Sequence, residues 1–348
     1  MKKIFLLAFL VAVSCKSDKS KENESSEIET LKQFSEVEVE NIFEDDSLSI
    51  RAIEIIGNNL AFAANKGTYG LYNSQNGEMK TGILKDGDYV PEFRAVASTS
   101  TDFFVLSVGN PALLYKTGDA GEMELVYRED HEKVFYDAMI FWNDKEGIAM
   151  GDPTENCLSV IITRDGGKNW KKIDCKNLPE AAEGEAAFAA SNSNIAVKGD
   201  KTWILSGGMK SRVFYSEDKG ENWEVFESPL DQGSATSGGY SMDFYDENNG
   251  FIIGGDYTAP EKNNGNKAIT SDGGKTWKLV SEGKNPGYAG SVRYVPNSGG
   301  KSLVASEDTG IYFSKDSGKN WEKISEEGFY TLRFINDSTA YAAGRGRI

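Results

Sequence analysis

The octapeptide SKDSGKNW, at residues 314–321, is one of four related octapeptides in a chain of 348 residues. The others begin at residues 163 (TRDGGKNW), 216 (SEDKGENW) and 270 (TSDGGKTW), so all four follow the pattern [S/T]-x-D-x-G-x-[N/T]-W. Their aspartates are 53, 54 and 44 residues apart. Weaker copies precede them at Asp119 and, with glutamine in place of the aspartate, at Gln75. Six units of about 45 to 50 residues are typical of a radial array rather than of separate domains.

Each unit consists of short strand-like segments. The third unit reads VFYDAMIFW, GIAMGD, LSVIITRDGG and NWKKIDC between residues 134 and 175. Glycine, asparagine and aspartate mark the turns between these segments, and no segment has a sustained helical period. Four short antiparallel strands per unit predict one blade of a β-propeller, so we expect an all-β fold.

The six units run from about residue 49 to residue 327, and the segments outside them predict a further blade. YTLRFINDSTAYAAGRGRI at the C-terminus supplies at least two strands, and FSEVEVENIFED before the first unit supplies one or two. Pairing between these termini would close the ring and leave no strand edge unpaired. We therefore predict seven four-stranded blades, the seventh being composite, with six blades as the alternative.

Every residue type of the octapeptide has a structural use in a turn between the third and fourth strands of a blade. The aspartate can accept backbone N–H groups, the glycine allows a positive φ, and the Ser or Thr hydroxyl can bond within the loop. The tryptophan can cover the hairpin with a large apolar face. We interpret the octapeptides as structural, through Asp165, Trp170, Asp218, Trp223, Asp272, Trp277, Asp316 and Trp321.

On these motifs the chain resembles the Asp-box, or BNR-repeat, propellers of the sialidase-like superfamily. GDP at residues 151–153, GEAAFAASN at 184–192 and GGDY at 254–257 make it most similar to the photosystem II stability/assembly-factor type of bacterial propeller. The resemblance covers about residues 38–348. It implies that the octapeptides lie on the outer rim, on the face opposite a ligand funnel. It says little about activity, because the fold hosts many functions.

The N-terminus has the pattern of an export signal. MKKIFLLAFLVAVSC places two lysines before an apolar run that is too short to span a bilayer, and it ends at Cys15. With its cysteine after AVS it resembles a bacterial lipoprotein signal, in which that cysteine carries the lipid; a plain signal peptide is the alternative. We expect residues 1–15 to be the signal, 16–36 a disordered polar tether and 37–348 one propeller domain. The lipid would anchor this domain in the bacterial envelope, in the outer membrane, facing the periplasm or the exterior.

Composition argues against several classes of function. The formal net charge is −16 and no basic stripe is present, so binding of nucleic acid has no electrostatic basis. His131 is the single histidine, which argues against histidine metal sites and Ser-His-Asp catalysis. The sequence has no dinucleotide or phosphate-loop fingerprint, so an oxidoreductase assignment has no support. We expect a monomer with no metal and no cofactor.

Cys157 and Cys175 lie symmetrically about the turn at residues 165–167 in CLSVIITRDGGKNWKKIDC. Opposed residues of a hairpin have Cβ atoms about 4.5–5.5 Å apart, close to what a disulfide requires. Because an exported chain is exposed to oxidising conditions, we predict a disulfide between them, with two free thiols as the alternative.

The innermost strand of a propeller blade begins at the funnel face, and the loop between the second and third strands also lies there. These positions in the repeat give the expected funnel residues: Arg51, Arg94, Asp137, Asp152, Glu185, Arg212, Tyr240, Asp256, Tyr257, Arg293 and Arg333, with Asp308 and Arg345 at equivalent loop positions. Arginine presents a planar fork that binds carboxylate or phosphate. One interpretation is therefore a site for an anionic ligand or a partner peptide. The other is a polar channel in which the arginines only pair with neighbouring acids.

A glycosidase is the alternative function. The sialidase-like enzymes hold a substrate carboxylate with three arginines and use a tyrosine nucleophile, a glutamate partner and an aspartate acid/base. The candidates here are Arg51, Arg293 and Arg333; Tyr240 or Tyr257 with Glu185; and Asp152 or Asp137. SIRAIEI stands where that family has an Arg-Ile-Pro signature, which weakens this hypothesis. The favoured function is a scaffold that binds an envelope protein or peptide, or an anionic small molecule or glycan.

Overall fold

The computed structural model describes residue 34 and residues 36–118 and 121–348. The expected signal with Cys15, almost all of the expected tether, and Asp119 lie outside the described residues. The described residues belong to one compact unit, Lys32–Ile348. Among them, no helix has the length and hydropathy needed to cross a membrane.

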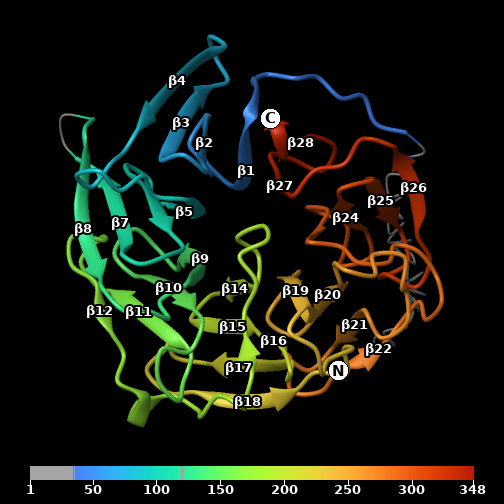
Figure 1. Ribbon diagram of the computed structural model, residues 1–348. Coiled ribbons are helices and arrows are strands. Elements are labelled where there is room, and N and C mark those ends of the chain that lie inside the picture. Colours follow the sequence, from blue (N-terminus) through green and yellow to red (C-terminus); the bar gives the residue numbers. More distant parts are fainter. Residues whose placement is uncertain (1–33, 35, 119–120) are drawn as a thin grey trace, which may run out of the picture. The chain divides into compact units, whose positions relative to one another are not determined.

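Six antiparallel four-stranded sheets follow one another along the chain and around a ring (Figure 1). Sheet 1 contains β1 (Glu44–Ile56), β2 (Asn59–Ala64), β3 (Thr68–Asn73) and β4 (Glu78–Ile83). Sheet 2 contains β5 (Phe93–Ser98), β6 (Phe103–Ser107), β7 (Ala112–Thr117) and β8 (Met123–Glu129). Sheet 3 contains β9 (Tyr136–Phe141), β10 (Gly147–Gly151), β11 (Ser159–Thr163) and β12 (Lys171–Lys172), and the 3₁₀ turn η1 (Cys175–Asn177) follows it.

The second half of the ring repeats this arrangement. Sheet 4 contains β14 (Ile195–Lys198), β15 (Lys201–Leu205), β17 (Arg212–Ser216) and β18 (Glu224–Glu227). Sheet 5 contains β19 (Ser237–Phe244), β20 (Gly250–Asp256), β21 (Lys267–Thr270) and β22 (Lys278–Leu279), extended by β16 (Gly207–Gly208) and β13 (Glu185–Ala186). Sheet 6 contains β23 (Ser291–Tyr294), β24 (Leu303–Glu307), β25 (Gly310–Ser314) and β26 (Glu322–Ser325). The all-β propeller predicted from the repeat is confirmed.

The ring closes where the two ends of the described chain meet. β27 (Thr331–Phe334) and β28 (Ala340–Ala343) form a two-stranded sheet that contacts both β23 and β1. β29 (Arg345–Arg347) pairs with the start of β1, through Glu44 opposite Arg347 and Ser49 opposite Arg345. Residues 36–43 contribute no strand, because β1 begins only at Glu44 and then continues as the inner strand of sheet 1. A four-stranded seventh blade therefore stays a prediction.

Each of the four octapeptides folds into the same hydrogen-bonded turn. In the turn at residues 163–170, Asp165 Oδ1 accepts the Asn169 N–H at 2.9 Å, and Oδ2 accepts the Asn169 amide at 2.7 Å. Thr163 Oγ1 accepts the Gly167 N–H at 2.9 Å, and Trp170 Nε1 donates to the Gly167 carbonyl at 3.2 Å. The other three turns repeat this pattern, so each residue type has the structural use inferred from the sequence.

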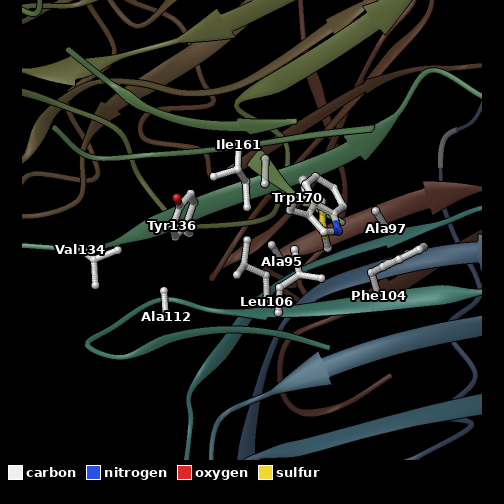
Figure 2. Packing of buried hydrophobic residues seen from close by; sticks show 12 residues of the cluster. Ala95, Ala97, Phe104, Leu106, Ala112, Val134, Tyr136, Ile161 and Trp170 are labelled. Atoms are coloured by element: carbon white, nitrogen blue, oxygen red, sulfur yellow. The ribbon is translucent and has the colours of Figure 1, made fainter. Parts of the chain in front are cut away.

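The octapeptide glycine and tryptophan also join each sheet to the one before it. Figure 2 shows the core between sheets 2 and 3, where Trp170 lies near Phe104, with ring centroids 6.3 Å apart. Gly167 has φ +76°, and a Cβ at this position would lie 2.2 Å from Cε1 of Phe104. Gly318 in sheet 6 faces Phe251 of sheet 5 in the same way. Glycine is therefore required both by the backbone conformation and by the approach of a neighbouring side chain.

Cys157 and Cys175 form a disulfide, with their Cα atoms 5.5 Å apart. Neither residue lies in a strand: Cys157 precedes β11, and Cys175 begins η1. The paired residues of this hairpin end at Ile161 opposite Lys172. The bond therefore ties the open end of the β11–β12 hairpin, beyond its short ladder.

Replacing Gly318 by alanine is expected to cost at least about 3 kcal/mol, because a positive φ and a buried clash act together. Gly318 has φ +78° and would place Cβ 2.1 Å from Cε2 of Phe251. The matched control is Gly77→Ala, where φ is +72° and no atom lies within 4 Å; here the loss should be about 1 kcal/mol. Urea unfolding measures both. Equal losses would show that the glycine serves the backbone conformation alone.

Candidate funnel site

Seven innermost strands contact one another in a closed circle: β1, β5, β9, β14, β19, β23, β27 and then β1 again. Two cavities lie along them. A cavity of about 580 Å³, called here the funnel cavity, is lined by Gly290 and Tyr330, which immediately precede β23 and β27, and by Arg51, which lies nearer the start of the long strand β1 than Glu54 does. A cavity of about 270 Å³, the axial cavity, is lined by residues further along the same strands, such as Glu54, Arg293 and Arg333. The two cavities therefore open at opposite ends of the inner strands.

The segment of residues 187–194, AFAASNSN, lies between the two cavities and is called here the axial segment. Its first four residues line the funnel cavity, and Asn192 lines the axial cavity. Apart from Phe188 it consists of small or polar side chains, and Ser191, Asn192, Ser193 and Asn194 are all at most 3% exposed. A buried backbone of this kind has to be hydrogen-bonded by its surroundings.

The inner strands supply those hydrogen bonds. Asn192 Oδ1 accepts the Met139 N–H at 2.9 Å, and its amide donates to the Val96 carbonyl at 2.7 Å. Ser193 bonds Ser241 at 2.8 Å. Partners of the axial segment lie on or just before six of the seven inner strands; they are Arg51, Arg94, Val96, Met139, Ser241, Met242, Gly290, Thr331 and Arg333. The seventh, β14, is the continuation of the segment itself.

Aromatic side chains form one wall of the funnel cavity. The ring of Phe188, from the axial segment, stacks on Tyr240 with centroids 4.0 Å apart and planes 1° apart. Tyr288 meets Tyr240 edge-on at 4.8 Å. Tyr257 stands beside them and is 53% exposed. This wall offers a large, rigid apolar surface with phenol groups at its edge.

Two arginines form another wall. Arg51 lies over the ring of Tyr330, 4.1 Å from its centroid, and donates to the Ala190 carbonyl at 3.4 Å. Arg94 is paired with Glu92 at 2.6 Å. Glu307, at the end of β24, and Asp308, in the turn that follows, also line the cavity. Arg51 makes no ion pair with any residue that the structure describes, so no carboxylate contacts its guanidinium in this cavity.

The predicted funnel residues therefore do not all converge. Arg51, Arg94, Tyr240 and Tyr257 line the funnel cavity, together with Asp308. Arg293 and Arg333 line the axial cavity instead. Among the described residues, no cavity brings together the three arginines of the sialidase hypothesis.

Glu185 and Arg212 are engaged with each other. The Glu185 side chain is fully buried, and its carboxylate accepts from the Arg212 guanidinium and from Ser206 Oγ at 2.5 Å. Asp256 accepts the Thr258 N–H at 2.9 Å in a turn at the end of β20. These residues hold loops at the funnel end of the ring.

The geometry does not favour Tyr240 as a nucleophile. Tyr240 is 2% exposed, and its hydroxyl donates to the Thr236 carbonyl at 2.7 Å. Burial, with smaller contributions from Tyr288 and Tyr257, raises the pKa of Tyr240, whereas an activated nucleophile needs a lowered pKa or an adjacent base. Its hydroxyl makes no hydrogen bond to Glu185 in the described chain.

Asp137 and Asp152 form a buried pair beside the start of the axial segment. Asp137 is completely buried, and its two oxygens have no hydrogen-bond partner in the described part of the chain. Burial and the nearby Asp152 raise the pKa of Asp137, and Arg94 opposes this effect. Asp152 Oδ1 accepts the Ala187 N–H at 2.7 Å, and burial raises the pKa of Asp152 to about 6. Asp152 thus holds the start of the axial segment, and neither carboxyl lines the funnel cavity.

Sequence reasoning missed Phe188, Tyr288 and Tyr330. Tyr288 and Tyr330 lie just before β23 and β27, and Phe188 lies in the longer segment that leads into β14. The expected positions were counted from the inner strands and from the loops between second and third strands, so the residues upstream of the inner strands were left out. The signal was an aromatic residue immediately upstream of the inner strand, as in PGYAGS and GFYTL. Within the described ranges, the structure contains no group of three or more His, Cys, Asp or Glu that could hold a metal ion.

The comparisons with known proteins agree with the fold. The Sortilin-Vps10 family (sortilin, neurotensin receptor 3) matches residues 158–288, less than half of the chain. No curated protein matches the sequence.

Solved structures are similar over most of the chain. YCF48 bound to a D1 peptide has a TM-score of 0.65 at 13% identity, covering 90% of this chain and 96% of the other. YCF48 from Cyanidioschyzon merolae has a TM-score of 0.63 at 11% identity, covering 90% and 97%. A GH74 xyloglucanase from Xanthomonas campestris has a TM-score of 0.61 at 13% identity, covering 88% of this chain and 52% of the enzyme. The TM-scores and coverages show a shared β-propeller fold, and at identities this low they show the fold alone.

Replacing Asp152 by asparagine is expected to stabilise the protein at pH 7.5 by about 2 kcal/mol. Asparagine keeps an acceptor for the Ala187 N–H but removes a charge whose folded-state pKa is raised to about 6. Because ionisation opposes folding here, the difference should shrink as the pH falls through 6 and vanish below about 4. Urea unfolding at pH 4, 5.5 and 7.5 measures it.

The control for this substitution is Asp144→Asn. Hydrogen bonds from Ser100 lower the pKa of the exposed Asp144, so its stabilising contribution is present at neutral pH and lost in acid. At neutral pH, Asp152→Asn should therefore raise the free energy of unfolding above that of the wild type, and Asp144→Asn should lower it. If the free energy of unfolding of Asp152→Asn differs from that of the wild type by the same amount at all three pH values, the raised pKa of Asp152 is contradicted.

Proposed function

We propose that this protein is an exported, lipid-anchored β-propeller that acts as a binding or assembly scaffold, and that its ligand is a peptide segment of an envelope protein held in the funnel cavity. The observation that carries the proposal is the pairing, in one cavity, of an aromatic wall with Arg51, a cation that has no carboxylate partner among the described residues. An unpaired guanidinium next to apolar surface favours a ligand that combines an anionic group with apolar side chains.

The size of the funnel cavity supports a peptide over a bulkier partner surface. A volume of about 580 Å³ lies within the range of small-ligand sites and accommodates a few residues of an extended chain. Tyr257 is 53% exposed at its edge, where it would be covered by a ligand that continues out of the funnel. The similar YCF48 structure was solved with a D1 peptide bound, so a propeller of this shape is compatible with peptide recognition.

Replacing Arg51 and Arg94 together by alanine is expected to weaken binding of an acidic, aromatic-containing peptide at least tenfold. Loss of a desolvated charge pair typically costs about 2–5 kcal/mol, and tenfold corresponds to about 1.4 kcal/mol. Fluorescence anisotropy with a library of labelled ten-residue peptides would identify the best binder and measure its Kd for each variant. The matched control is Arg128→Ala, which removes an arginine of β8 that pairs with Asp86 and Asp130 and does not line the cavity.

Two outcomes would count against this function. Equal peptide affinity in the wild type and the double variant would place binding outside the funnel. Turnover of fluorogenic sialosides or other glycosides, abolished by Tyr240→Phe and Glu185→Gln, would instead favour the glycosidase. The burial of Tyr240 and the Glu185–Arg212 pair lead us to expect no turnover.

Cys15→Ser is expected to release the protein from the membrane fraction of a bacterial host, because the proposed anchor is the lipid on Cys15. The proposed lipid anchor rests on the residues AVS immediately before Cys15. Fractionation followed by intact mass measurement would detect both the release and the loss of acyl mass. Ser17→Ala is the control, and membrane retention of the Cys15 variant would contradict the anchor.

A further inference from the structure

The axial cavity contains a buried guanidinium without an acceptor. The side chain of Arg293, on β23, is 15% exposed, and its Nε is buried without a hydrogen-bond partner. The nearest carboxylate oxygen, Asp243 Oδ1, lies 3.9 Å from Nη1, beyond hydrogen-bond distance. In the described chain Arg293 has no hydrogen bond at all, although arginine carries five N–H donors.

The neighbouring groups are already engaged. Arg333 Nε donates to Glu54 at 3.2 Å, and Nη2 donates to the Asn192 carbonyl at 3.0 Å. The two oxygens of Asp243 accept the N–H groups of Phe244 at 3.0 Å and Tyr294 at 2.8 Å. The protein groups around the cavity therefore leave the donors of Arg293 unfilled.

An unfilled buried guanidinium is costly, because burial removes water from a full charge without supplying a partner. Burial and then Arg333 lower the pKa of Arg293 to about 10, so the group is still charged at neutral pH. Two arginines and two carboxylates line the cavity, so its fixed charges balance. The volume of about 270 Å³ holds one small polyatomic anion and several waters, each water taking about 30 Å³.

We propose that the axial cavity is a binding site for a small oxyanion, of the size of phosphate, sulfate or acetate, held by the guanidinium fork of Arg293. Such an anion accepts two parallel N–H donors, which no residue of the described chain does for Arg293. The axial segment separates this site from the funnel cavity, so the proposal does not depend on what the funnel binds.

Isothermal titration calorimetry with inorganic phosphate, and then with sulfate and acetate, tests the site in protein dialysed into an oxyanion-free buffer of constant ionic strength. The wild type should show saturable 1:1 binding. Arg293→Lys keeps the charge but removes the planar fork and should weaken binding at least tenfold. Arg128→Lys, the matched control outside the cavity, should bind like the wild type.

Asp243→Asn gives a test of opposite sign. It removes a negative charge 3.9 Å from Arg293 and should strengthen phosphate binding several-fold. Circular dichroism of each variant checks that it is folded, and Arg293→Lys and Asp243→Asn decide the result. The proposal is overturned if the wild type shows no saturable heat with any of the three anions. It is equally overturned if Arg293→Lys and Arg128→Lys bind phosphate alike.

Discussion

The described structure depends on one constraint: the backbone at the centre of the ring is buried and has to be hydrogen-bonded. The axial segment meets this requirement by placing Ala, Ser and Asn residues where the seven inner strands converge. Asn192 alone joins Val96 of sheet 2 to Met139 of sheet 3. Ser191 and Ser193 reach the opposite side of the circle, at Gly290 and Ser241. One stretch of eight residues therefore contacts nearly every repeat.

This arrangement determines what the two ends of the ring present. On one side the axial segment places Phe188 against Tyr240 and offers the Ala190 carbonyl to Arg51, which gives the funnel cavity its aromatic and cationic walls. On the other side the Asn192 carbonyl engages Arg333. The arginines are consequently divided between two cavities, so Arg51, Arg293 and Arg333 do not face one common ligand in the described chain.

The sequence predicted the sheets well and the site only in part. The octapeptides specify their turns through contacts between residues at most four positions apart, such as Asp165 with Asn169, so a local pattern was sufficient. A local pattern did not tell how far along an inner strand, measured from the funnel end, a given residue lies. Arg293 stands two residues after the beginning of β23, which displaces it by about 7 Å from the funnel end. The partners of the axial segment lie up to 141 residues away in sequence, and no periodicity indicates them.

The contact between each octapeptide glycine and the preceding sheet has an evolutionary consequence. Gly167 accommodates Phe104, Gly274 accommodates Trp203 and Gly318 accommodates Phe251, so the fitted surfaces always belong to two successive repeats. The unit that a duplication can copy with its packing contacts intact is therefore the junction between two successive sheets. A duplication whose boundaries fall inside a sheet would inherit both halves of a matched pair. A duplication that copies a single sheet would have to find a new large apolar neighbour for its glycine.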